Sequence, residues 1–214
     1  FDGNASDMSG NNYHGTVQGA TLSTDRFGTA SKAYNFDGTD DYITRAIPTE
    51  LAGNTPFTVS MWFNPSGNKV QSYLTAFGSA GTDRSYHIGF PYANGQFQAG
   101  FYNRGVDTSY IAPLNQWQHL VLSWDGSQTQ TVYIDGVKVA DNNSSGAVPN
   151  IDPAGVLNIG RQVGHAEYFK GTIDEVRIYN RAFEVTEVGE LHQTERPTYY
   201  NGLIAHYPFN GNAN

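Results

Sequence analysis

The stretch Phe57-Thr58-Val59-Ser60-Met61-Trp62-Phe63 decides the fold class of this chain. Its side chains alternate, so that every second residue lies on the same side of an extended backbone. One face would carry Phe57, Val59, Met61 and Phe63, and the other would carry Thr58, Ser60 and Trp62. An apolar face that recurs with a period of two is typical of a strand with one side on a hydrophobic core. The stretch therefore predicts a β-strand that covers a core.

Similar short segments lie on both sides of this strand. Two of them flank the Gly-centred turn 37–40, and two others flank Asp135-Gly136, which is a strong hairpin signal. The expected strands cover residues 32–36, 42–46, 73–77, 85–90, 96–102, 117–124, 131–139, 155–160 and 171–179. Only residues 183–191 have a partly helical apolar stripe. The pattern predicts an all-β fold, an antiparallel β-sandwich or jelly roll with one short helix near the C-terminus.

Composition limits the partners of the chain. Its 214 residues suffice for one domain with a substantial core. The net charge is −8 and the 12 Lys and Arg residues form no cluster, which argues against nucleic acid as a partner. There is no cysteine, so disulfides and thiolate metal sites are excluded. No apolar run approaches the roughly 20 residues of a membrane span, so we expect no membrane insertion.

The two ends of the sequence resemble each other. Residues 209–214, Phe-Asn-Gly-Asn-Ala-Asn, repeat residues 1–6, Phe-Asp-Gly-Asn-Ala-Ser, with four identities, and an apolar run precedes the second copy. We expect a sandwich over 1–194, a linker over 195–201, and over 202–214 a strand equivalent to the opening strand of a module. That strand would complete its own sandwich or a neighbouring copy; self-closure is favoured by its higher effective concentration. Chance similarity in a Gly/Asn-rich sequence is the alternative.

Six stretches carry a family resemblance when they are taken in order. They are residues 7–16, 34–43, 57–62, 116–119, 133–136 and 171–180, the last reading Gly-Thr-Ile-Asp-Glu-Val-Arg-Ile-Tyr-Asn. Together they resemble the laminin-G-like jelly roll of the concanavalin A-like lectin/glucanase superfamily, in the form common in secreted bacterial proteins. The resemblance implies a module of a larger secreted or cell-surface bacterial protein. It leaves several functions open, because this fold hosts lectins, adhesion modules, spacers and glycanases.

A structural calcium ion is expected from two oxygen-rich segments. Hard cations bind several carboxylate and carbonyl oxygens, which the loop after Asp7 and its Ser-Gly-Asn-Asn turn can supply. On its strand, Asp174 is expected to share a face with the apolar Val176 and Ile178, where an uncompensated carboxylate is costly. The resemblance implies calcium at the position of Asp174 and a carbonyl from the turn of Gly38. The predicted ligands are Asp7, Asn12, Gly38 and Asp174. Alternatively, Asp174 accepts backbone N–H bonds and Asp7 builds an Asx turn.

The acidic residues do not favour catalysis. A retaining glycosidase needs two carboxylates about 5–5.5 Å apart, and the superfamily's glycanases place them as Glu-x-Asp-x-(x)-Glu on one strand. This motif is missing, and the pairs Asp40-Asp41 and Asp174-Glu175 are adjacent, so that in a strand they would point to opposite faces. We therefore predict that the chain is not an enzyme; a degenerate glycanase is the third-ranked alternative.

Carbohydrate recognition is the favoured function. Sugar sites combine aromatic faces with planar polar groups, and residues 84–110 and 161–168 are rich in both. The candidate ligand-binding residues are Tyr86, Tyr102, Arg104 and Tyr168. The three tryptophans are expected to belong to the scaffold. The sequence thus predicts a non-catalytic, calcium-stabilised module that binds a glycan or polysaccharide. The alternative is a protein–protein adhesion or spacer module in a tandem array, with neighbouring modules as partners.

Overall fold

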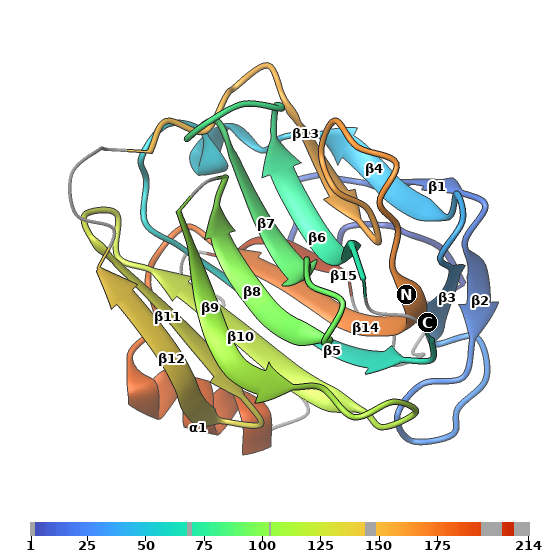
Figure 1. The fold of residues 1–214 in the computed structure, drawn as a ribbon. Coiled ribbons are helices and arrows are strands. Elements are labelled where there is room, and N and C mark those ends of the chain that lie inside the picture. Colours follow the sequence, from blue (N-terminus) through green and yellow to red (C-terminus); the bar gives the residue numbers. More distant parts are fainter. Residues whose placement is uncertain (1–2, 68–69, 103, 144–148, 194–202, 208–214) are drawn as a thin grey trace.

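The computed structural model describes residues 3–67, 70–102, 104–143, 149–193 and 203–207, which form a sandwich of two antiparallel sheets (Figure 1). In spatial order, the seven-stranded sheet contains β1 (Thr16–Gln18), β4 (Tyr42–Ala46), β13 (Val156–Ile159), β6 (Ser72–Gly78), β7 (Ser85–Phe90), β8 (Gln96–Phe101) and β9 (Arg104–Ile111). The eight-stranded sheet contains β12 (Val137–Asn143), β11 (Thr129–Ile134), β10 (Gln118–Trp124), β5 (Phe57–Pro65), β14 (Lys170–Tyr179), β3 (Ala33–Asp37) and β2 (Thr21–Ser23), with β15 (Leu203–Tyr207) beside β14. The predicted all-β sandwich is confirmed.

Strand β5, the stretch from which the fold was inferred, lies in the middle of the eight-stranded sheet between β10 and β14. Phe57, Val59, Met61 and Phe63 are completely buried between the two sheets, as the alternation predicts. Around Phe57 the core is aromatic: its ring meets those of Phe77 and Tyr86 edge to face, with centroids 5.2 and 5.0 Å apart. Such edge-to-face pairs add to the free energy gained from apolar burial alone.

The far edge of β14 is shared by two strands that are distant in sequence. Residues Lys170–Ile173 pair with β3, and Val176–Tyr179 pair with β15. Ile204 and Ala205 of β15 are buried in the core. The carbonyl oxygen of Ile204 accepts hydrogen bonds from Ser9 Oγ and Asn11 Nδ2, both at 2.9 Å. Residues 203–207 therefore pair within their own chain, whereas the expected linker and residues 208–214 lie outside the described part.

The helix near the C-terminus, α1 (Val185–Gln193), covers the outer face of the eight-stranded sheet (Figure 1). Val188 and Leu191 pack with Phe183 against side chains of β10, β11 and β14. The short 3-10 helix Thr49–Leu51 is the other helical element among the described residues. None of the described helices is long and apolar enough to cross a membrane. The outer face of the seven-stranded sheet, in contrast, is presented by β6–β9 at the front of Figure 1.

Candidate functional site

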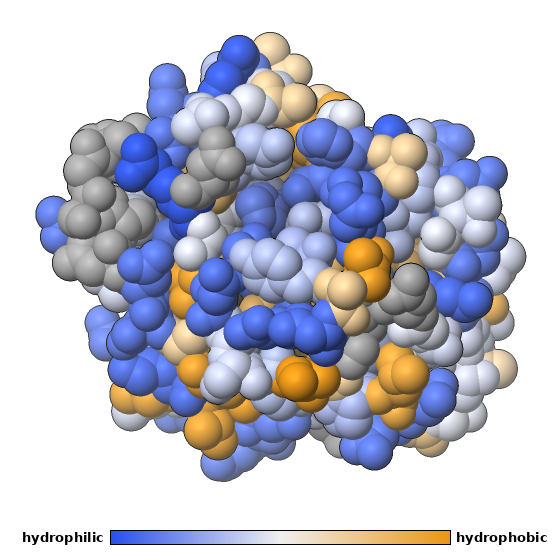
Figure 2. Space-filling model, viewed as in Figure 1, coloured by the Kyte–Doolittle hydropathy of each residue, from blue (hydrophilic) through white to orange (hydrophobic). Residues whose placement is uncertain are grey.

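The outer face of the seven-stranded sheet carries a connected row of polar side chains. In β7, Tyr86, Ile88 and Phe90 point into the core, so His87 points to the outer face. The Nε2 atom of His87 lies 3.1 Å from Gln98 Oε1 of β8. Gln98 Nε2 in turn donates to Asp107 Oδ1 of β9 at 2.7 Å. Hydrophilic side chains accordingly gather over β6–β9 in Figure 2.

The chemical state of this row follows from its contacts. Burial lowers the pKa of His87, so the imidazole is neutral near pH 7, and its Nε2–H donates to Gln98. Tyr92 donates from its hydroxyl to Asp107 Oδ1 at 3.1 Å, and Gln98 Nε2 lies 3.2 Å from the same hydroxyl. Asp107 is exposed, and the hydrogen bonds from Tyr92 and Gln98 both end on its Oδ1 atom. Among the described residues Oδ2 has no donor, so it is available to accept a hydrogen bond from an incoming hydroxyl group.

Small residues make room for this row. A side chain at Gly105 of β9 would place its Cβ 2.6 Å from Gln98 Cδ, which is closer than real Cβ atoms approach. Glycine at this position lets Gln98 lie flat across β9 and reach Asp107.

Aromatic rings flank the polar row on the side of the 160–169 loop, which connects β13 and β14. Tyr73 of β6 meets His87 edge to face at 5.5 Å, and His87 meets Tyr102 at 6.3 Å. Tyr102 stacks on His165 of the loop, with centroids 6.3 Å apart and planes inclined by 11°. Burial and the nearby carboxylate of Glu167 raise the pKa of Tyr73 to about 12, so its phenol stays protonated and can donate a hydrogen bond.

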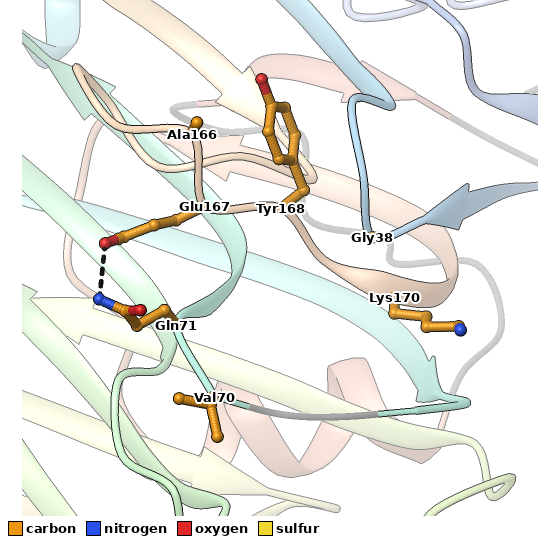
Figure 3. A pocket seen from close by; sticks show the side chains of 7 residues that line it. All are labelled: Gly38, Val70, Gln71, Ala166, Glu167, Tyr168 and Lys170. Carbon is orange, nitrogen blue, oxygen red and sulfur yellow. Dashed lines mark hydrogen bonds between the residues drawn. The ribbon is translucent and has the colours of Figure 1, made fainter.

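A small pocket of about 220 Å³ lies at one end of this cluster (Figure 3). It is lined by Gly38, Val70, Gln71, Ala166, Glu167, Tyr168 and Lys170. Glu167 points toward Gln71 and accepts a 3.0 Å hydrogen bond from its Nε2, whereas the Tyr168 ring points away from this pair (Figure 3). The guanidinium of Arg161 lies 5.4 Å from the Tyr168 ring and 4.7 Å from that of Tyr42. The pocket thus combines an amide, a carboxylate and a tyrosine with a cation beside it.

The four predicted ligand-binding residues lie in different environments. Tyr86 is completely buried and donates its hydroxyl to Gln130 Oε1 at 2.8 Å, so assigning it to a surface site was wrong. Tyr102 belongs to the aromatic cluster, and Tyr168 lines the pocket. Arg104 is partly buried and pairs with Asp83 at 2.6 Å. Tyr102 therefore contacts the 160–169 loop through His165, and Tyr168 belongs to that loop and meets Tyr42.

Two residues of the face were missed from sequence. Gln98 alternates with the buried Phe97 and Ala99, and this alternation was a usable signal for an outward polar side chain. Tyr73 gave no such signal, because the register of β6 shifts between Tyr73 and Thr75. A shift of one residue moves side chains from one face of a sheet to the other.

A group of carboxylates at the β3–β4 turn could hold a metal ion. Oxygen atoms of Asp37, Asp40 and Asp41 lie within 4.8 Å of one another. Asp41 is buried, and burial together with the neighbouring carboxylates raises its pKa. Gly38, one of the predicted calcium ligands, belongs to the same turn. Oxygen donors of this kind suit a hard divalent cation.

Two of the other three predicted calcium ligands, Asp7 and Asp174, have protein partners. Asp7 accepts hydrogen bonds from Ser9 N and Tyr13 N, both at 2.9 Å, and thereby orders its own loop. Asn12 occupies a turn position with φ of 59°. Asp174 accepts a 2.8 Å bond from the buried guanidinium of Arg26. Calcium at these residues stays a prediction.

The expected orientation of Asp174 was wrong. The register between β14 and β5 shifts between Asp174 and Arg177, and Glu175 has φ of 51°. Asp174 pairs in register with Trp62, which lies on the outer face, whereas Val176 and Ile178 face the core. A bulge of this kind adds a residue and reverses the faces of those that follow.

The fold is an antiparallel β-sandwich, and comparison with known proteins identifies its family. Residues 37–189 match the laminin G family profile described as the concanavalin A-like lectin/glucanases superfamily, and the chain belongs to this family. A search of curated proteins finds no match.

Solved structures share the fold at low sequence identity. Domain 4 of AbnA, a GH43 extracellular arabinanase from Geobacillus stearothermophilus, was solved with arabinotriose. It has a TM-score of 0.68 and 24% identity over 89% of this chain and 93% of that one. The binding domain of Paraclostridial Mosquitocidal Protein 1 has a TM-score of 0.70 and 19% identity, over 87% of this chain and 48% of that one. The ligand binding domain of botulinum neurotoxin serotype D was solved in complex with N-acetylneuraminic acid. It has a TM-score of 0.67 and 16% identity, over 89% of this chain and 48% of that one. This chain therefore spans about half the length of the two toxin structures.

Proposed function

We propose that this chain is a non-catalytic carbohydrate-binding module of a larger secreted or cell-surface bacterial protein. The observation that carries the proposal is the outer face of the seven-stranded sheet, where Gln98 and Asp107 lie beside the half-buried ring of Tyr102, and the buried His87 and Tyr73 support them from below. Aromatic rings contact the C–H faces of a sugar, and planar amides and carboxylates bind its hydroxyl groups. The protein partners of Gln98 and Asp107 fix both side chains before a ligand arrives, which lowers the entropy lost on binding.

The structural neighbours support this choice of ligand class. The arabinanase domain was solved with arabinotriose and the neurotoxin domain with N-acetylneuraminic acid, and both share the sandwich. Asp107 is the exposed charge of the polar row, and it would repel a carboxylate ligand there. We infer that the preferred ligand is a neutral oligosaccharide. We infer that the module itself lies outside the cell, by analogy with the domain of the extracellular arabinanase.

Calcium remains the proposed stabilising ion. The support for a cation is the convergence of Asp37, Asp40 and Asp41. The buried Asp41 carboxylate accepts a hydrogen bond from Asp37 N and has no positively charged partner among the described residues. The predicted set with Asp7, Asn12, Gly38 and Asp174 is the competing location. The two locations are distinguished by which carboxylate, Asp41 or Asp174, is needed for a response to calcium.

The test of glycan binding is calorimetric titration with arabinotriose, cellotriose and sialyllactose. Replacing Asp107 by alanine should weaken binding of a neutral trisaccharide about 10- to 100-fold, because a hydrogen bond to a charged acceptor is lost. Asp141→Ala is the matched control, since this exposed carboxylate lies on β12 of the other sheet and pairs with Lys138. If both variants bind as the unaltered protein does, the polar row is not the site. Preference for sialyllactose would refute the neutral-ligand inference.

A further inference from the structure

A second pocket lies on the opposite side of the sandwich, on the outer face of the eight-stranded sheet. Helix α1 covers one part of this face, and the loop between β2 and β3 covers another through the buried side chain of Arg26. Between the two covers is a pocket of about 290 Å³. It is lined by Arg26, Phe27, Trp62, Trp117, His192 and Gln193.

Trp62 and Arg26 hold each other in fixed positions. The guanidinium of Arg26 lies 4.8 Å from the Trp62 ring and 4.3 Å from the Phe27 ring. It also donates to Asp174 Oδ2 at 2.8 Å. The His192 ring is nearly parallel to that of Trp62, with centroids 5.6 Å apart and an interplanar angle of 22°. Arg26, Trp62 and His192 are therefore held in place before any ligand binds.

Two aromatic residues of this pocket are not used by the core. Phe27 is 54% exposed, although apolar rings of this size are usually buried. Trp117 is half-buried and has no ring or hydrogen-bond partner within the described ranges. An exposed phenylalanine held under a guanidinium contributes little to folding, so its placement calls for another explanation. Around both rings are the polar groups of Arg26 and Gln193.

We propose that this pocket is a second carbohydrate site, which takes a neutral pyranose with equatorial hydroxyl groups. Such a ring exposes axial C–H bonds on its two faces and can stack on an indole, while its rim hydroxyls reach the amide of Gln193. The ligand is neutral because the Arg26 guanidinium is already engaged by Asp174 Oδ2 and by the Phe27 and Trp62 rings, so it is not free to pair with an anionic group. This inference goes beyond the proposed function, since the pocket and the Asp107 row lie on different sheets.

The consequence is a module with two sites on opposite faces. A single domain would then bind two glycan chains at once, or bridge two parts of a polysaccharide. Bridging raises the overall affinity through effective concentration and adds no contact at either site.

The distribution of tryptophan allows a direct test. The chain has three tryptophans: Trp62 and Trp117 line this pocket, and Trp124 is completely buried in the core. The polar row and its aromatic neighbours contain tyrosine and histidine instead. Protein labelled with 5-fluorotryptophan should give three ¹⁹F resonances, assigned by Trp117→Phe and Trp62→Phe. Titration with cellotriose should shift the Trp62 and Trp117 resonances and leave that of Trp124 in place.

Two substitutions link the shift to the pocket. Phe27→Ala and Trp117→Ala should each weaken cellotriose binding at this site about tenfold, and the exposure of Phe27 makes unfolding of the first variant unexpected. Asp107→Ala should leave the tryptophan response intact. If calorimetry detects cellotriose while no tryptophan resonance moves, the second site is refuted and the proposed function stands. The second site is also refuted if the tryptophan resonances still shift in both pocket variants. The same holds if free indole shifts these resonances and cellotriose does not.

Discussion

Replacing Ile204 by alanine tests whether β15 is an integral strand of the sandwich. Ile204 is 1% exposed and belongs to the core between the two sheets. Its strand pairs with the Val176–Tyr179 half of β14. No other described strand pairs with that half of the edge.

The expected loss follows from the buried volume. The substitution removes three carbon atoms from water-free surroundings, which costs about 2.4 kcal/mol in transfer free energy. The cavity that remains raises the total to about 3 kcal/mol. For a domain of this size, each kcal/mol lowers Tm by about 2–4 °C, so the expected decrease is about 6–12 °C.

Differential scanning calorimetry or urea unfolding measures this loss. Ile111→Ala is the matched control, because Ile111 lies in β9 and is 58% exposed. Its free energy of unfolding should change by no more than about 0.5 kcal/mol. Equal effects of the two substitutions would show that β15 is not docked in solution, and the pairing described above would then be refuted.

Three further outcomes are expected. Calcium should raise Tm and a chelator should lower it again. Asp41→Asn should remove this response if the β3–β4 turn binds the ion, whereas Asp174→Ala should remove it if the predicted set binds the ion. A Tm that changes with neither calcium nor chelator contradicts both locations. Burial and the charge of Glu175 raise the pKa of Asp174 to about 8, from an ordinary value of 3.8. Folding therefore favours its protonated form, and the resulting stability is lost as pH rises through about 8. In urea titrations from pH 5 to pH 9, Asp174→Asn should flatten the decline by up to about 1.4 kcal/mol per pH unit, and an unchanged slope would show that Asp174 does not titrate there. Purified protein should release no reducing ends from arabinan or cellulose, and sustained release that one acidic substitution abolishes would establish an enzyme.

The core could be read from sequence because its signal is local. In β5 the buried face follows directly from alternation, and Asp135-Gly136 correctly marks the turn between β11 and β12. The helix was expected over 183–191 and spans 185–193. The same alternation would have placed Tyr86 in the core beside Ile88 and Phe90. Its amphipathic side chain suggested a ligand contact, but the hydroxyl is satisfied internally by Gln130.

The site was less predictable because it depends on register. Gln98 of β8 and Asp107 of β9 lie opposite each other on neighbouring strands. Tyr73 of β6 lies near Glu167, which belongs to a loop far along the chain. Neither pairing has a sequence spacing that would reveal it. Asp174 shows the same limit at a single residue, since the bulge after it directs the carboxylate to Arg26 on the outer face. Bulges are set by the pairing of whole strands and leave no motif in one sequence.

The shared edge of β14 also has a consequence for biosynthesis. During translation, β3 is available to pair with Lys170–Ile173 as soon as β14 leaves the ribosome, but β15 is synthesised only after β14 and α1. Until then, the Val176–Tyr179 half of the edge lacks a partner, and Ser9 and Asn11 lack their acceptor at Ile204. An open edge of this kind can pair with another nascent chain. Docking of β15 therefore closes this edge, and its delay defines the interval in which the nascent module is prone to misassembly.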